Sequence, residues 1–283
     1  MVMLKVIAVW LLAAAAAMAA LAQQNVAAPK LSAAQIVEKN VVARGGTDAW
    51  RKINSMAWTG HVESASEPDR KMAFLLEQRR PGQVRFEISA AGQKSVRIYN
   101  GTEGWKMRAT SSGKPELQPY TADELEFARG AQVIEGPLMD FVAKQSVITL
   151  AGIEAVEGRL AYVLEVKPPL GETHRVWVDA ETFLETRLER RFHTAAGQAG
   201  VSTVEYRDYR PFEGLQLPVT IETGPVSGKS AARLVIERVA LNPPLDEHAF
   251  DRPIVPLKRR MGSATVDTRG AAAANPARPA APP

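Results

Sequence analysis

The sequence predicts a mainly β protein with one open antiparallel sheet of about eleven strands. Residues 55–241 consist largely of short runs in which apolar and polar residues alternate, and the runs end at Gly, Pro or Asn-Gly. In one run, Val84, Phe86 and Ile88 alternate with charged residues. A period of two places such a set on one face of a pleated sheet. An open sheet of this size curls as its twist accumulates, so its concave face has to be filled.

The N-terminus has the three-part pattern of an export signal. Lys5 precedes an apolar stretch that runs from residue 6 to about residue 19, and the small-residue triplet Ala20-Leu-Ala22 follows. The apolar stretch is shorter than the roughly 20 residues that span a bilayer. We therefore expect cleavage after Ala22, a periplasmic location and a linker over residues 23–31. The chain contains no cysteine, which excludes disulfides and a lipid-bearing N-terminal cysteine.

Two short helices are expected before the first strand. Ser32 and Gln35 have the spacing of a capping box, and apolar residues follow at helical spacing up to Gly45-Gly46. A second helix is predicted over residues 47–53. The folded domain is expected to span residues 32–256.

Helical patterns interrupt the strands at only one place. Before it, Asn100-Gly101 predicts a hairpin turn. Thr121-Ala-Asp-Glu124 then has the spacing of a capping box, and Pro137 is expected to begin another short helix. Residues 121–144 are the natural cover for the concave face.

The C-terminal residues 257–283 are rich in Ala and Pro and are expected to be disordered. The formal net charge is +4, but the tail holds five of the 35 Lys and Arg and only Asp267 among the 31 acidic residues. Leaving out Lys5 and this tail, the body has 29 basic and 30 acidic residues. The net charge therefore gives no reason to expect nucleic acid binding by the folded part.

The sequence lacks the common catalytic signatures. The run from Gly224 to Ser230 has three residues between its glycines, where a phosphate-binding loop has four, and it joins two expected strands. There is no Gly-x-Ser-x-Gly elbow. The four histidines are scattered: His61, His174, His193 and His248. We expect no catalytic residue, no metal and no cofactor, although a hydrolase stays open as a minor alternative.

Several segments occur in the order typical of a known family. They are Gly45-Gly-Thr-Asp-Ala-Trp50, Tyr99-Asn-Gly-Thr-Glu-Gly-Trp105, Gly158-Arg-Leu-Ala-Tyr162, Trp177-Val-Asp179-Ala-Glu-Thr182, and Asp208-Tyr209 followed by Gly214-Leu-Gln-Leu217-Pro218. Over roughly residues 32–250 the chain resembles the periplasmic outer-membrane lipoprotein-sorting (LolA-like) family. The resemblance implies a strongly curved, incomplete, half-open β-barrel with helices at its mouth and an apolar cavity for acyl chains.

The function expected from this resemblance is that of a periplasmic carrier or binder of lipoprotein or lipid acyl chains, without enzymatic activity. We expect a monomer that touches membranes only transiently. The expected cavity residues are Trp58, Phe74, Phe86, Ile98, Trp105, Leu125, Phe127, Leu138 and Phe141. Two alternatives stay open: these residues form an ordinary core, or the fold serves as a cell-envelope sensor or scaffold for a protein partner.

Overall fold

The computed structural model describes residues 30–64, 67–110, 114–131, 134–193, 199–225 and 232–254. The chain divides into a compact unit that ends at Pro253 and a remainder that begins at Ile254. The expected export signal, most of the expected linker and the C-terminal tail lie outside the described residues.

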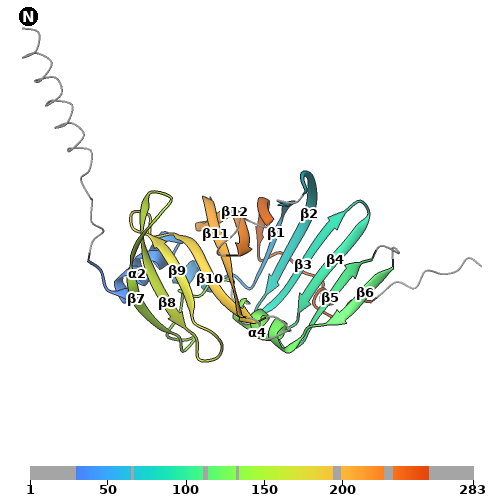
Figure 1. Ribbon diagram of the computed structural model, residues 1–283, viewed down its shortest axis with the longest axis horizontal. Helices are drawn as coiled ribbons and strands as arrows, with labels where there is room; N and C mark the ends of the chain where they lie inside the picture. Colours follow the sequence, from blue (N-terminus) through green and yellow to red (C-terminus); the bar gives the residue numbers. More distant parts are fainter. Residues whose placement is uncertain are drawn as a thin grey trace, which may run out of the picture. The chain divides into compact units, whose positions relative to one another are not determined.

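The compact unit is built around one open sheet of 13 antiparallel strands, two more than the sequence suggested (Figure 1). The spatial order is β6-β5-β4-β3-β2-β1-β13-β12-β11-β10-β9-β8-β7, so β6 and β7 are its edges. The strands are β1 Ser55–Ser64, β2 Glu67–Arg79, β3 Gln83–Ala90, β4 Gln93–Tyr99, β5 Gly104–Ala109, β6 Pro115–Pro119, β7 Val147–Val156, β8 Arg159–Lys167, β9 His174–Asp179, β10 Glu185–His193, β11 Ala199–Phe212, β12 Leu215–Pro225 and β13 Ala232–Leu241. This is the expected incomplete barrel.

Two meanders, β1 to β6 and β7 to β13, meet where β1 pairs with β13. The register shifts between Thr59 and Gly60, which is a β-bulge. A Cβ at Gly60 would lie 1.9 Å from the carbonyl oxygen of Val235, so only glycine fits there. A bulge bends its strand and increases the local twist, which favours curling of the sheet.

The described helices are α2 Ala33–Ala43, α3 Thr47–Arg51 and α4 Ala122–Ala131. The capping box of Ser32 and Gln35 is present as predicted. The backbone N–H of Glu124 donates to Oγ1 of Thr121, and the Glu124 carboxylate accepts from the Thr121 N–H, so α4 also begins as predicted. Among the described residues, no helix has the length and apolar character needed to cross a membrane.

The prediction of a short helix that begins at Pro137 is wrong. Residues 134–145 form successive turns, and we call them the cover segment. Asp140 and Gln145 have φ of 53° and 56°, and such left-handed residues interrupt an α-helix. The Lys144 amine donates to the carbonyl oxygens of Gly136 and Met139, which supplies partners that a helix would otherwise provide.

The main core lies on the face of the sheet that the helices and the cover segment pack against, which we call the helix-covered face. One cluster joins Trp50, Met56, Trp58, Phe74 and Leu217. A second joins Ile36 of α2 and Leu138 of the cover segment to strands β8 to β10. Burial of these apolar side chains is the main stabilising contribution to the fold.

Candidate functional site

A cavity of about 800 Å³ lies between α4, the cover segment and the ends of β8, β9 and β10. Part of its wall is apolar, from Phe127, Val166 and Leu170. The side chain of Phe127 is 43% exposed and that of Leu170 is 87% exposed. The charged lining residues are Asp123, Glu126, Arg129, Lys144, Glu172, Arg190 and Arg191, and His174 adds a polar imidazole. The cavity is thus amphipathic rather than purely apolar.

Arg190 of β10 places a cation in this wall. It lies two residues beyond buried Leu188 on the same strand and therefore on the helix-covered face. Its guanidinium carbon is 5.6 Å from the ring centroid of Phe127. Its Nε atom is buried without a hydrogen-bond partner, and no described carboxylate forms an ion pair with it. Burial lowers the pKa of Arg190, against the opposing influence of Tyr206.

His174, at the start of β9, also lines the cavity. Its Nδ1 is buried and has no hydrogen-bond partner among the residues that the structure describes. Burial, and secondly the charge of Arg190, lower the pKa of His174 to about 4. The imidazole is therefore neutral at physiological pH.

This low pKa predicts a pH-dependent stability. Between about pH 6.5 and pH 4 the unfolded chain binds a proton at His174 that the folded chain does not, so stability falls as pH falls through this range. We expect the free energy of unfolding to drop by about 2 kcal/mol from pH 7 to pH 5. Urea titrations at several pH values measure this slope, and His174→Gln should remove most of it. An unchanged slope in the variant contradicts the assignment.

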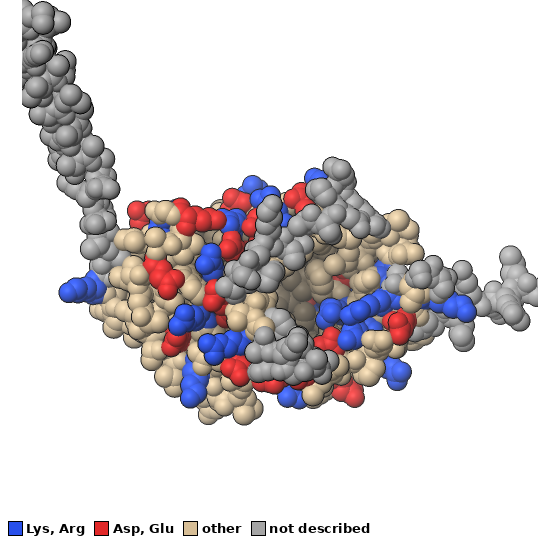
Figure 2. Space-filling view, in the orientation of Figure 1, with Lys and Arg blue, Asp and Glu red and all other residues tan. Residues whose placement is uncertain are grey.

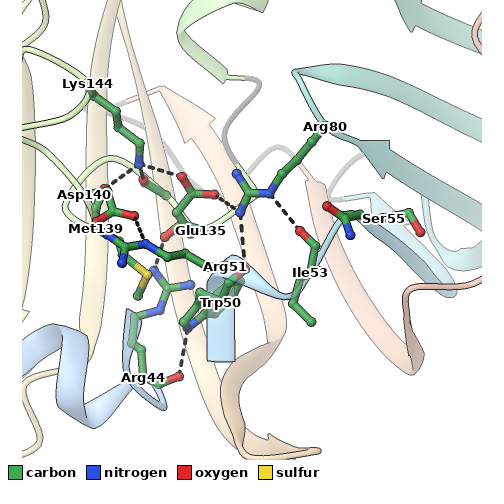
Figure 3. Close-up of polar contacts among 12 residues, drawn as sticks. Arg44, Trp50, Arg51, Ile53, Ser55, Arg80, Glu135, Met139, Asp140 and Lys144 are labelled. Carbon is green, nitrogen blue, oxygen red and sulfur yellow. Dashed lines mark hydrogen bonds and ion pairs between the residues drawn. The ribbon is translucent and has the colours of Figure 1, made fainter. Parts of the chain in front are cut away.

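The cover segment is held by a buried charge network centred on Glu135 (Figure 3). Nη2 of Arg80, just beyond β2, lies 2.7 Å from Oε2 of Glu135, as an ion pair rather than an aligned hydrogen bond. Nζ of Lys144 lies 2.9 Å from Oε1. Arg44, at the end of α2, donates to the Glu135 carbonyl oxygen at 2.5 Å and pairs with Glu185 at 3.0 Å. The Glu135 carboxylate thus connects the cover segment to the end of β2, where Arg80 lies.

Glu135 is 5% exposed, and its ionisation depends on these partners. Burial raises the pKa of Glu135, but the charge and hydrogen bond of Lys144, together with Arg80, outweigh burial and leave the pKa below its ordinary value. Lys144 also lines the cavity, so its amine is held in place by Glu135 at the cavity wall.

A basic region lies over β4 to β6, apart from the cavity. Lys and Arg gather there at one side of the central hollow in Figure 2. Arg97 and Lys106 are register partners on the helix-covered face. Both form ion pairs with Glu124 of α4, at 3.7 Å and 2.8 Å. Both cations therefore share one carboxylate partner, whereas Arg190 has none among the described residues.

The residues expected to line one apolar cavity fall into separate places. Trp58 and Phe74 are buried in the first core cluster, and half-buried Phe86 packs against them. Leu138 and Phe141 belong to the second cluster. Leu125 is half-buried, and of the nine expected residues only Phe127 is among the residues that line the described cavity.

The expectation that Ile98 and Trp105 share a face with Phe86 is wrong. Phe86 pairs with Arg97, so Ile98 points to the opposite face, and Trp105 is its partner on β5. There Ile98 and Trp105 pack with Phe250, which lies beyond the last strand. The alternation of apolar and polar residues was correct within each strand. Which apolar residues of neighbouring strands share a face, however, is decided by the register between the strands.

The sequence reasoning missed Arg190 and His174 as cavity residues. Arg190 follows Thr186 and Leu188 at a spacing of two, and His174 precedes Val176 and Val178 in the same way. A titratable residue at an apolar position of an alternating strand is a usable signal, because such groups are rarely buried without a purpose. Among the described residues, no group of three or more His, Cys, Asp or Glu is arranged to hold a metal ion.

No family model and no curated protein matches the chain. Solved structures with a similar fold include the LolA superfamily protein NE2245 from Nitrosomonas europaea, at 15% identity and a TM-score of 0.49, covering 78% of this chain and 97% of that one. A putative outer membrane lipoprotein-sorting protein domain from Vibrio parahaemolyticus matches at 13% identity and a TM-score of 0.49, covering 77% and 95%. A DUF1329 family protein from Desulfovibrio piger matches at 12% and 0.49, covering 77% and 97%.

The names of the first two structures agree with the family that the sequence motifs resemble. At these identities and TM-scores the similarity concerns the fold alone. It adds no argument about function, for which the cavity has to be considered by itself.

Proposed function

We propose that this protein binds the acyl chain of a lipid or lipoprotein in the cavity beside α4, as an exported, periplasmic carrier without catalytic activity. The observation that carries the proposal is the cavity of about 800 Å³ on the helix-covered face of an open sheet. Binding pockets for small molecules usually have volumes of roughly 300 to 1,000 Å³. The cavity is therefore large enough for a ligand of lipid size.

The apolar wall suits the body of such a ligand. Phe127 and Leu170 line the cavity while remaining largely exposed, and a bound chain would remove both from water. Burying one CH₂ group contributes about 0.8 kcal/mol, so a 16-carbon chain gains at most about 12 kcal/mol. This gain is enough for binding even after the cost of ordering a flexible chain.

An exposed wall also suits a carrier that has to release its ligand. The cover segment and α4 are short elements on one side of the sheet, and α4 packs on β5 and β10 through few contacts. A loosely attached α4 permits the ligand to leave without unfolding the sheet, while the cover segment stays held by the Glu135 network. The alternative of a sensor or scaffold that uses the same face would instead require a protein partner.

The proposal predicts that Phe127→Asp weakens acyl-chain binding by roughly 10-fold or more, because a charge replaces an apolar wall. Phe127 is 43% exposed and the new carboxylate would lie beside unpaired Arg190, so the melting temperature should not fall. Displacement of a fluorescent fatty-acyl probe measures the affinity. Val142→Asp is the matched control, since Val142 is exposed on the cover segment but is not among the residues that line the cavity.

If the wild-type protein binds no acyl probe, the carrier proposal fails. If Phe127→Asp and Val142→Asp bind the probe as well as wild type does, acyl binding occurs elsewhere on the protein. Native mass spectrometry of protein taken gently from the periplasm tests the same proposal without a chosen probe.

A further inference from the structure

We propose that Arg190 makes this cavity selective for ligands that carry an anionic oxygen group, a carboxylate or a phosphate, at the end of their apolar part. The inference rests on the proposed acyl-chain binding and specifies the ligand class. It follows from how Arg190 is placed, compared with other partly buried arginines of the sheet and of α2.

Other partly buried arginines meet carboxylates, Arg44 beside the cover segment and Arg187 and Arg207 on the opposite face of the sheet. Arg44 pairs with Glu185 at 3.0 Å, and Arg187 pairs with Glu205 at 3.0 Å. Arg207 pairs with Glu157 at 2.5 Å and also with Glu222. Arg190 has no such partner among the described residues and instead lies against the ring of Phe127.

Arg190 is partly buried and its Nε atom is fully buried, and holding an unpaired charge away from water is costly. An anion that pairs with Arg190 would therefore be stabilising. A guanidinium keeps its proton under all physiological conditions. It also presents parallel N–H donors that match the two oxygens of a carboxylate or phosphate. An anionic group that reaches Arg190 would complete its hydrogen bonding.

The geometry of the wall fits an amphiphile rather than a small anion alone. Phe127 contacts Arg190 directly, and Val166 and Leu170 continue the apolar wall of the same cavity. Arg191 and Arg129 also line the cavity and favour an anion, while Asp123, Glu126 and Glu172 oppose it. Lys144 already has a carboxylate partner in Glu135, which it shares with Arg80. Arg190 is therefore the decisive cation.

The test compares hexadecanoate with hexadecanol, which has the same chain without the charge, at neutral pH where the carboxylate is ionised. Wild type should bind hexadecanoate roughly 10-fold or more tightly than hexadecanol, as expected for a charge-assisted hydrogen bond. Arg190→Met should abolish this preference while keeping hexadecanol binding. Arg175→Met is the control, since Arg175 is half-exposed and paired with Glu165.

Arg190→Met should fold, because an apolar side chain of similar length replaces an unpaired and partly buried charge, and its melting temperature should equal or exceed that of wild type. Should it fail to fold, Arg190→Lys supplies the test: it keeps the charge, loses the planar fork and should show a smaller preference. An undiminished preference in the variant that folds overturns the inference.

Inorganic phosphate separates the two sources of the anion. Displacement of hexadecanoate by phosphate in wild type but not in Arg190→Met supports the site and shows that a free anion is sufficient. An Arg190-dependent preference without displacement supports an anionic lipid head group.

Other outcomes separate the two proposals. If wild type binds hexadecanoate and hexadecanol equally, acyl binding stands and the proposed role of Arg190 fails. If phosphate raises the melting temperature through Arg190 while neither chain binds, the anion site stands and the carrier proposal fails.

Discussion

Glu135→Gln is expected to lower the free energy of unfolding by about 3 kcal/mol, the lower end of the cost of breaking a buried ion pair from one side. The glutamine keeps the shape of the side chain but leaves Arg80 and Lys144 without their counter-ion. The side chains of Arg80 and Lys144 are 33% and 23% exposed, and their remaining contact with water limits the loss of stability. Urea denaturation at pH 7 measures the free energy of unfolding of both proteins.

The matched control is Glu165→Gln. Glu165 pairs with Arg175 at 3.0 Å, but both side chains are more than a third exposed. Removing such a surface pair should cost less than about 1 kcal/mol. Equal effects of the two substitutions would contradict a special role for the network around Glu135. Because Lys144 lines the cavity, Glu135→Gln should also alter ligand binding, which Glu165→Gln should not.

Much of the fold was predictable because its signals are local. The capping boxes at Ser32 and Thr121 depend on residues three positions apart, and both helices begin where the spacing indicated. Likewise, Asn100-Gly101 lies between two strands that pair. The helix expected at Pro137 failed because Lys144 and Glu135 impose turns, and this network also includes Arg80 and Arg44, which are distant in sequence.

The site was less predictable because it depends on register and on contacts between distant segments. Alternation assigned Ile98 to an apolar face, but only the pairing of Phe86 with Arg97 decides which face that is. Phe250 covers Ile98 from a segment some 150 residues away in sequence, which no periodicity indicates. The charged side chains of the cavity meet there only after β8, β9 and β10 align.

The Gly45-Gly46 pair provides the second large expected effect. Gly45→Ala should lower the free energy of unfolding by about 2 kcal/mol more than Gly46→Ala does. Both glycines have positive φ, at 109° and 84°, so alanine is strained at either position. They differ in their surroundings, because a Cβ on Gly45 would lie 2.3 Å from the carbonyl oxygen of Gly214, whereas nothing lies within 4 Å of one on Gly46.

This close approach is how α2 is attached to the sheet. The carbonyl oxygen of Arg44 accepts a hydrogen bond from the backbone N–H of Gln216, which requires the helix end to lie against the start of β12. The same oxygen accepts from Nε1 of Trp50, which joins α2 to α3. The side chain of Arg44 then reaches Glu185 and the cover segment. Moving the helix end by an added methyl group should therefore weaken the attachment of the cover segment as well as the core.

Thermal and urea unfolding of Gly45→Ala and Gly46→Ala, with acyl-probe binding measured in parallel, test this expectation. If Gly45→Ala costs no more stability than Gly46→Ala, the contact with Gly214 is not the reason for glycine at position 45. If it costs stability but leaves binding unchanged, α2 supports the core without positioning the cover.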